Sequence, residues 1–180
     1  MVAHNSRGFD HPMIQARVLF HGLPPLPSVK VLDTLQQAKK NFRLPNNKLD
    51  SIAAFLGLPR KVDAGGIETW IQYMMGNPEA VAHMHEYCLM DTELLEEVYL
   101  KLCAFGHSGT DFNAAHYHED TKLRCNVCGS PNVELTGRNV FTAISEFKEV
   151  RCSSCGAVSR TRQAANTVEK RRSIVVSPKT

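Results

Sequence analysis

Four of the six cysteines stand in two Cys-x-x-Cys pairs, and this spacing constrains the fold more than any other feature of the 180 residues. The pairs are Cys125 with Cys128 and Cys152 with Cys155, and a glycine follows each pair. A Cys-x-x-Cys turn can direct both sulfurs at one ion, and the glycine can adopt the positive φ that closes the turn. Two such turns supply four thiolates, the tetrahedral ligand set of a structural Zn²⁺ site. Protein ligands would fill all four positions, which leaves none for a catalytic water.

The segment between the two pairs predicts the shape of this metal-binding unit. Residues 134–151 contain β-branched and aromatic residues in partial alternation, which favours a β-hairpin. We therefore predict a zinc ribbon over residues 124–162, with a core so small that the metal contributes most of the folding free energy. Iron in a rubredoxin-like site and a redox dithiol are the alternatives. Cys88 and Cys103 stand apart from the pairs and are predicted to be small buried apolar residues.

The charge is divided unevenly along the chain. Residues 1–120 hold 10 Lys and Arg against 14 Asp and Glu, a net charge of −4, whereas residues 121–180 hold 11 against 4, a net charge of +7. The basic part can attract a polyanion such as nucleic acid, and a solvated basic tail is the alternative. Phe141 and Phe147 are interleaved with the basic side chains, which suits base stacking but equally suits the ribbon's own core. The basic side chains in or beside the ribbon are Lys122, Arg124, Arg138, Lys148, Arg151, Arg160 and Arg162.

Neither a membrane span nor a secretory leader is recognisable. No apolar run approaches the ~20 residues that cross a bilayer. The first ten residues lack both a charged leader and an apolar h-region. The sequence therefore predicts a cytoplasmic protein with no membrane partner.

The amino-terminal body, residues 1–106, is predicted to be rich in helices and poor in strands. Asn77 and Pro78 form a helix start, with Asn as the cap and Pro at the first position, and this helix is expected to run to about Cys103. Val29–Leu32 is a short apolar run compatible with the end of a strand. A linker over 107–123 and a basic tail over 163–180 complete the chain, and the tail is expected either to be disordered or to pair with the ribbon. The other expected helices lie near residues 13–20, 34–42 and 48–56 and around Trp70.

Two short motifs in the body carry chemistry. The first is His4-Asn5-Ser6-Arg7-Gly8-Phe9-Asp10, and the second is Tyr87-Cys88-Leu89-Met90-Asp91. Each motif alone is weak, because a Tyr and an Asp four residues apart usually form a surface pair on a helix. In this order, about 80 residues apart, they resemble the second and third motifs of the DEDD superfamily of 3′–5′ exonucleases, in its tyrosine subtype.

Other stretches are similar to phage-type members of this family that end in a zinc ribbon. They are Asp33-Thr34 and residues 38–58 and 91–102, and the resemblance covers roughly residues 1–160. It implies an α/β fold, namely the helix-rich, carboxy-terminal part of an RNase H-like domain followed by the small β ribbon. It also implies a metal-dependent exonuclease that acts on nucleic acid, with single-stranded DNA favoured over RNA, and a phage-encoded protein in a host cell.

The resemblance implies a role for each matching residue. Asp10 and Asp91 would be two of four carboxylates that hold two Mg²⁺ or Mn²⁺ ions, and Tyr87 would orient the attacking water. Asn5 and Phe9 would shape the site around the terminal nucleotide. A cluster of carboxylates is the ligand set that these hard cations need for phosphodiester hydrolysis.

One element of the family pattern has no counterpart here, namely the first-strand Asp-x-Glu that precedes the second motif. Two carboxylates and about three strands would then be absent. We expect either a start assigned inside a longer reading frame, a truncated or split product completed by another polypeptide, or a remnant kept for binding. The alternative function is therefore a non-catalytic zinc-ribbon module that binds nucleic acid or a partner protein.

Overall fold

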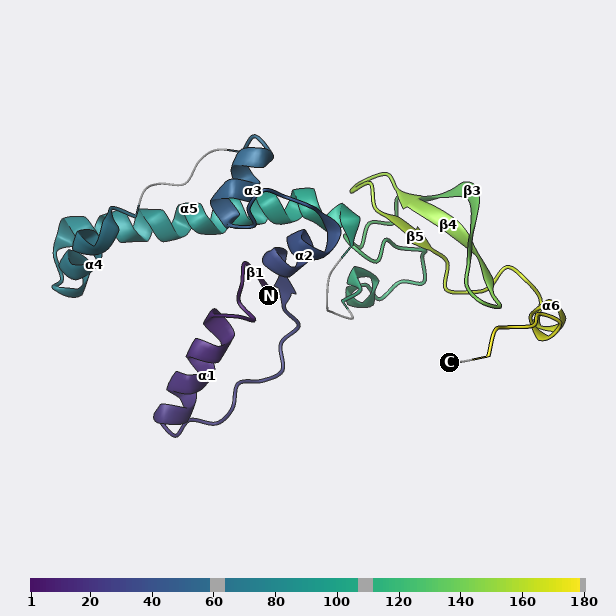
Figure 1. Cartoon of the computed structure of the whole chain (residues 1–180), viewed down its shortest axis with the longest axis horizontal. Coiled ribbons are helices and arrows are strands. Elements are labelled where there is room, and N and C mark those ends of the chain that lie inside the picture. Colours follow the sequence, from purple (N-terminus) through teal and green to yellow (C-terminus); the bar gives the residue numbers. More distant parts are fainter. Residues whose placement is uncertain (59–63, 107–111, 179–180) are drawn as a thin grey trace. The chain divides into compact units, whose positions relative to one another are not determined.

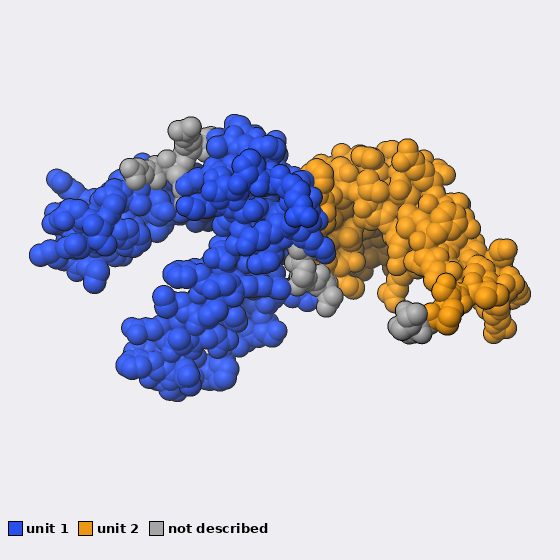
Figure 2. All heavy atoms as spheres, viewed as in Figure 1, with its two compact units in different colours: residues 1–102, 107–110 blue, residues 103–106, 111–180 orange. Residues whose placement is uncertain are grey.

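The computed structural model describes residues 1–58, 64–106 and 112–178, which form two units (Figure 2). The first unit is Met1–Leu102 without the undescribed residues 59–63, and the second contains Cys103–Gly106 and residues 112–178. In chain order the first unit holds β1 Val2–Ala3, α1 Asp10–Phe20, β2 Leu32–Asp33, α2 Thr34–Asn41, α3 Leu49–Phe55, α4 Gly66–Met74 and α5 Pro78–Leu102. The second holds η1 Cys103–Phe105, η2 Ala114–Tyr117, β3 Val133–Phe141, β4 Glu146–Cys152, β5 Val158–Arg160 and α6 Val168–Arg172.

The two units together are a mixed α/β protein, as the sequence predicts. In the described part of the first unit the only strands are β1 and β2, two residues each, which pair in parallel with Val2 opposite Leu32 and Ala3 opposite Asp33. The second unit carries an antiparallel sheet in the order β3-β4-β5. The amino-terminal body is therefore rich in helices and poor in strands. Among the described residues, no helix is both long and apolar enough to cross a membrane.

The core of the first unit lies where α2 and α3 pack against the long helix α5 (Figure 1). The helix expected near residues 48–56 is confirmed as α3, in which Ile52 and Ala53 are buried while Leu49 and Leu56 pack partly against the core. Gln37 of α2 donates from Nε2 to the carbonyl oxygen of Leu102 at 2.7 Å, which fixes α2 to the end of α5. The buried residues of this core are Ala38, Ile52, Ala53, Leu94, Val98 and Leu102.

Local signals define the helix starts. Asn77 accepts hydrogen bonds at Oδ1 from the backbone N–H groups of Glu79 and Ala80, as expected of a cap that precedes Pro78. Asp33 caps α2 in the same way, accepting from Leu35 and Gln36. These caps satisfy backbone donors that have no partner inside a helix.

One prediction for the lone cysteines is wrong. Cys103 is buried as expected, but Cys88 is exposed. The covered side of α5 runs from Met84 to Leu94 through Tyr87 and Asp91, both partly buried, and Cys88 lies beside this stripe. A thiol at this position consequently faces solvent.

The ribbon hairpin forms close to the predicted bounds, and its two aromatic residues have different environments. Phe147 of β4 is buried, whereas Phe141 at the end of β3 is 70% exposed. Phe147 therefore belongs to the ribbon's small core. The β3–β4 register shifts between Leu135 and Asn139, which forms a β-bulge around Gly137 at a φ of 80°.

The tail pairs with the ribbon, which was one of its two expected states. Ala165 donates its backbone N–H to the carbonyl oxygen of Glu146 at 2.6 Å. Asn166 accepts from the backbone N–H of Glu146 at 3.1 Å and donates to the carbonyl oxygen of Ile144 at 3.0 Å. The chain then forms α6, capped by Thr167.

Candidate functional site

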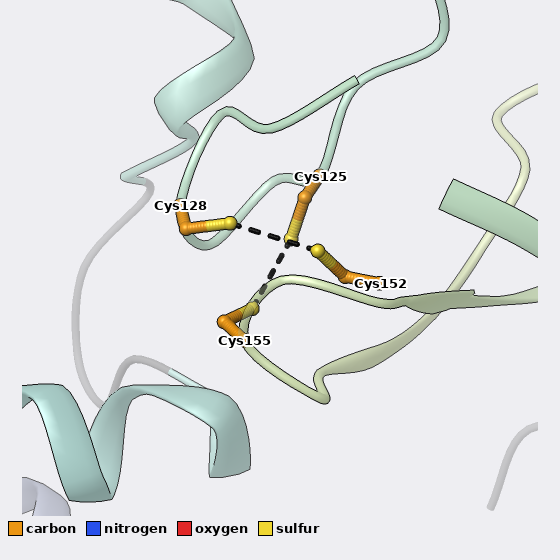
Figure 3. Close-up of side chains that lie close together, drawn as sticks. All are labelled: Cys125, Cys128, Cys152 and Cys155. Atoms are coloured by element: carbon orange, nitrogen blue, oxygen red, sulfur yellow. Dashed lines mark hydrogen bonds between the residues drawn. The ribbon is translucent and has the colours of Figure 1, made fainter. Parts of the chain in front are cut away.

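The four paired cysteines come together in the second unit (Figure 3). Their sulfur atoms all lie within 4.8 Å of one another, and Sγ of Cys125 lies 3.7 Å from Sγ of Cys155, as does Sγ of Cys128 from Sγ of Cys152. Four sulfurs about 2.3 Å from a tetrahedral Zn²⁺ would lie about 3.8 Å apart. The four thiols therefore fit a zinc ion, and they would fill its coordination sphere.

Each Cys-x-x-Cys turn closes in the same way. The backbone N–H of Gly129 donates to the carbonyl oxygen of Cys125, and that of Gly156 donates to Cys152, both at 2.9 Å. Both glycines have positive φ, 75° and 79°, which residues with a Cβ rarely adopt. The glycine after each cysteine pair is therefore required by the backbone.

Ionisation of the thiols is unequal. Burial raises the pKa of Cys155, and the neighbouring thiols of Cys128, Cys125 and Cys152 raise it further. Burial also acts to raise the pKa of Cys152, but hydrogen bonds from the backbone N–H groups of Cys155 and Ser154, together with those from the thiols of Cys128 and Cys155, outweigh it and bring this pKa to about 7. Burial raises the pKa of Cys128. Without a cation among them, the four sulfurs cannot all be thiolates at neutral pH.

The predicted linker is not wholly a loop. Its second half forms η2 and packs on the first cysteine turn, with the backbone N–H of Ala114 donating to the carbonyl oxygen of Asn126 at 2.8 Å. Arg124 donates to both carboxylate oxygens of Asp120, at 2.8 and 2.6 Å, and to the carbonyl oxygen of Gly129 at 2.7 Å. The hydrogen bonds from Arg124 lower the pKa of Asp120 to about 2. These contacts hold residues 114–124 against the ribbon.

The first motif of the body forms a tight turn between β1 and α1. Asn5 has a left-handed backbone, with a φ of 67°, and its carbonyl oxygen accepts from the N–H groups of Gly8 and Phe9. A Cβ on Gly8 would lie 2.7 Å from Oδ1 of Asn5, so any larger residue at this position would displace the Asn5 side-chain amide. Phe9 is 59% exposed, and Asp10 is exposed at the first position of α1.

Asp33 holds this turn in place. Oδ1 accepts from the backbone N–H of Asn5 at 3.0 Å, and Oδ2 accepts from that of Arg7 at 3.3 Å. The same carboxylate caps α2, and the side chain is only 3% exposed. The buried carboxylate of Asp33 thus joins the turn that contains Asn5 and Phe9, here called the candidate substrate turn, to α2.

Tyr87 and Asp91 lie one turn apart on α5 and are both partly buried. Within the described residues, the cysteine cluster is the only group of three or more Cys, His, Asp or Glu whose ligand atoms gather as for a metal ion. Asp10 and Asp91 therefore belong to no complete carboxylate cluster there. The Asp91-Thr92-Glu93 sequence is an Asp-x-Glu, but two positions apart on a helix point to opposite sides, so it cannot replace the first-strand motif.

Sequence reasoning missed the positioning role of Asp33. The sequence analysis names this residue only as part of a stretch that is similar to phage-type exonucleases. It also missed His4, whose Nδ1 lies 2.8 Å from Oγ1 of Thr34 and whose Nε2 lies 3.0 Å from the carbonyl oxygen of Asn47. An aspartate directly before a predicted helix is a cap signal that identifies Asp33 in part. Its second set of partners lies 26 to 28 residues away and has no local signal.

The fold and the cysteine cluster define an RNase H-like α/β protein with a small β ribbon that is compatible with zinc. A family model described as RNase H superfamily matches residues 1–103, and the chain belongs to this superfamily. No curated protein and no solved structure matches the chain. RNase H-like proteins are generally hydrolytic nucleases that bind nucleic acid and use divalent metal ions, so membership supports a nuclease-type function.

Proposed function

We propose that this chain is part of a metal-dependent 3′–5′ exonuclease of the tyrosine-type DEDD class, acting on single-stranded DNA. The observation that carries the proposal is the RNase H superfamily match over residues 1–103. That span contains the two motifs that resemble the second and third motifs of the class, in the expected order. The likeness to phage-type members supports an origin in a phage and action inside a host cell.

Each motif residue has a role in this proposal. Asp10 and Asp91 each supply one carboxylate ligand to Mg²⁺ or Mn²⁺, ions that would activate water and stabilise the leaving oxygen. Tyr87, one turn before Asp91 on α5, orients the attacking water. Asn5 and the exposed ring of Phe9 hold the terminal nucleotide, since an exposed aromatic ring can stack on a base.

Two further carboxylates are needed, because the described residues gather no carboxylate cluster around Asp10 and Asp91. We propose that a polypeptide segment outside these 180 residues supplies them as an Asp-x-Glu on a neighbouring strand. The added strands would also extend the two-residue pairing of β1 with β2. Single-stranded DNA and that segment are thus the proposed partners.

The test is Mg²⁺- or Mn²⁺-dependent release of mononucleotides from end-labelled single-stranded DNA. We expect little release by the chain alone and restored release when a segment bearing Asp-x-Glu is joined to it. Asp10→Asn or Asp91→Asn should then lower the rate by orders of magnitude. Glu93→Gln is the matched control, because Glu93 is exposed on the opposite side of α5 from Asp91. A completed protein that stays active with both aspartates replaced would refute the site assignment.

A second candidate is a zinc-ribbon module that binds nucleic acid without catalysis. The guanidinium carbon of Arg160 lies 3.8 Å from the ring centroid of the buried Phe147, while Arg160 itself is exposed. Arg160 and Arg162 both line a cavity of about 650 Å³ in the second unit. A guanidinium plane held on an aromatic ring leaves its other face open to a base. This candidate predicts salt-sensitive binding that is lost on zinc chelation and weakened in Arg160→Gln.

A further inference from the structure

A second cavity of about 650 Å³ lies in the first unit, beside the turn that contains Asn5. Its wall is built from three separate stretches of chain, namely the turn that follows β1, the exposed side of α2 and the loop that leads into α3. The lining includes Asn5, two lysines, Lys39 and Lys48, and two apolar side chains, Leu35 and Leu49. The proposed terminal-nucleotide residue Asn5 thus shares one cavity with two cationic side chains.

Hydrogen bonds hold the cavity wall, and most of them join residues that are far apart in the sequence. His4, directly after β1, contacts Thr34 of α2 and the carbonyl oxygen of Asn47 in the loop. The loop is further fixed by the backbone N–H of Lys48, which donates to Oδ1 of Asn46 at 2.9 Å. Asn5 is held by Asp33. A wall fixed in this way costs little ordering entropy when a ligand binds.

The charge in this cavity differs from that of the unit around it. Residues 1–102 hold 10 Lys and Arg against 11 Asp and Glu, so the unit is close to neutral. In the cavity two ammonium groups face one carboxylate, that of Asp50. Lys39 and Lys48 are exposed, and neither forms an ion pair with any residue that the structure describes. Their charge is therefore available to an anion from solvent.

We propose that this cavity binds the single strand of nucleic acid next to the terminal nucleotide, with Lys39 and Lys48 contacting its phosphates. Leu35 and Leu49 supply the apolar wall for a sugar or base. The inference rests on the proposed exonuclease function, because Asn5 belongs both to the cavity wall and to the candidate substrate turn. A strand fits better than a free phosphate, since a cavity of about 650 Å³ is far larger than that ion and its wall is partly apolar.

The test is the salt dependence of oligonucleotide binding by the full, zinc-loaded chain without added Mg²⁺ or Mn²⁺. Fluorescence anisotropy of a labelled single-stranded oligonucleotide gives the affinity at several salt concentrations. Each phosphate contact to a single strand contributes about 0.7 to the slope of log affinity against log salt. The Lys39→Gln, Lys48→Gln double variant should therefore lower the magnitude of the slope by about 1.4.

Lys40→Gln is the matched control, because Lys40 neighbours Lys39 on α2, is exposed and does not line the cavity. The proposal predicts a clearly smaller change for this variant than for either cavity lysine. Basic residues of the ribbon contribute equally to every variant and cancel in the comparison. Equal slopes for the double variant and the wild-type chain would overturn the proposal, and so would equal effects of Lys40→Gln and Lys39→Gln.

A competition arm separates a strand from a simple anion. Inorganic phosphate at constant ionic strength should displace the oligonucleotide poorly, and affinity should increase with oligonucleotide length. Efficient displacement by phosphate together with no length dependence would overturn the assignment to a strand.

Failure of the catalytic proposal is distinguishable from failure of this inference. If the completed protein releases no mononucleotides but the slope falls as expected, the exonuclease proposal is wrong and the binding cavity stands. If the completed protein is an active exonuclease but the double variant binds with an unchanged slope, the cavity proposal alone is wrong.

Discussion

Replacement of Asp33 tests whether one carboxylate holds the candidate substrate turn to the core. In Asp33→Ala the α2 cap is lost, which costs about 1 kcal/mol. The N–H of Asn5 also loses a hydrogen bond to a buried charged acceptor, worth about 2 kcal/mol, and the longer bond from Arg7 adds about 1. We therefore expect the free energy of unfolding of the first unit to fall by about 4 kcal/mol, a large part of the ~5–15 kcal/mol typical of a domain.

Two further variants separate the contribution of the helix cap to this free energy from the contribution of the hydrogen bonds to the turn. Asp33→Asn keeps the Oδ1 acceptor for Asn5, Leu35 and Gln36 and loses only the bond at Oδ2, so it should cost about 1–2 kcal/mol. Asn77→Ala removes a cap that bonds only its own helix α5, so it should cost about 1 kcal/mol. The difference between the losses of unfolding free energy in Asp33→Ala and Asn77→Ala then measures the contribution of the hydrogen bonds from Asn5 and Arg7 to Asp33.

Denaturant unfolding followed by tryptophan fluorescence is the assay, because the only tryptophan, Trp70, lies in α4 of the first unit. Hydrogen exchange at the amides of Asn5 and Arg7 gives an independent readout, and both should exchange faster in Asp33→Ala. Equal destabilisation by Asp33→Ala and Asn77→Ala, with unchanged exchange at the turn, would refute the reasoning.

Three predictions concern the ribbon. One zinc ion per chain should be found by elemental analysis, and chelation should abolish the amide-exchange protection of β3–β5 while leaving α5 protected, because the metal supplies most of the ribbon's folding free energy. In thermal unfolding, Gly129→Ala should destabilise the zinc-bound ribbon more than Gly156→Ala. Both glycines have positive φ, so an alanine at either position costs about 1–2 kcal/mol of backbone strain. Only at Gly129 would the new Cβ also lie 2.5 Å from Nε2 of His118. Zinc affinity, measured by competition with a chromophoric chelator, should increase with pH between about 6 and about 8, because the raised pKa values of Cys128 and Cys155 mean that protons must leave before these sulfurs bind; an affinity independent of pH would contradict this.

Features with local signals were predictable from the sequence. The Cys-x-x-Cys spacing fixes which sulfurs meet, since each turn is short and carries its own closing glycine. The Asn77-Pro78 cap and the 3-4 spacing around Ile52 locate two helices for the same reason, because neighbours on a helix surface are close in sequence. The mixed α/β class and the RNase H-like body are confirmed as well.

Features that depend on distant partners were not predictable. Which of Phe141 and Phe147 is buried depends on how the ribbon packs, and composition treats the two rings alike. The pairing of Ala165 with Glu146 has no signal in the tail itself. The exposure of Cys88 depends on which side of α5 the other elements cover. The roles of Asp10, Tyr87 and Asp91 stay predictions, because the carboxylates that would complete their site are not gathered among the described residues.

The bulge around Gly137 bears on how the ribbon behaves at high concentration. β3 is an edge strand nine residues long, and a straight edge of that length offers a row of unpaired backbone groups to another chain. The register shift between Leu135 and Asn139 interrupts this row at its centre, and Arg138 places a positive charge at the interruption. We therefore expect a second copy to add at most a short run of hydrogen bonds on either side, which disfavours intermolecular sheets built on this hairpin.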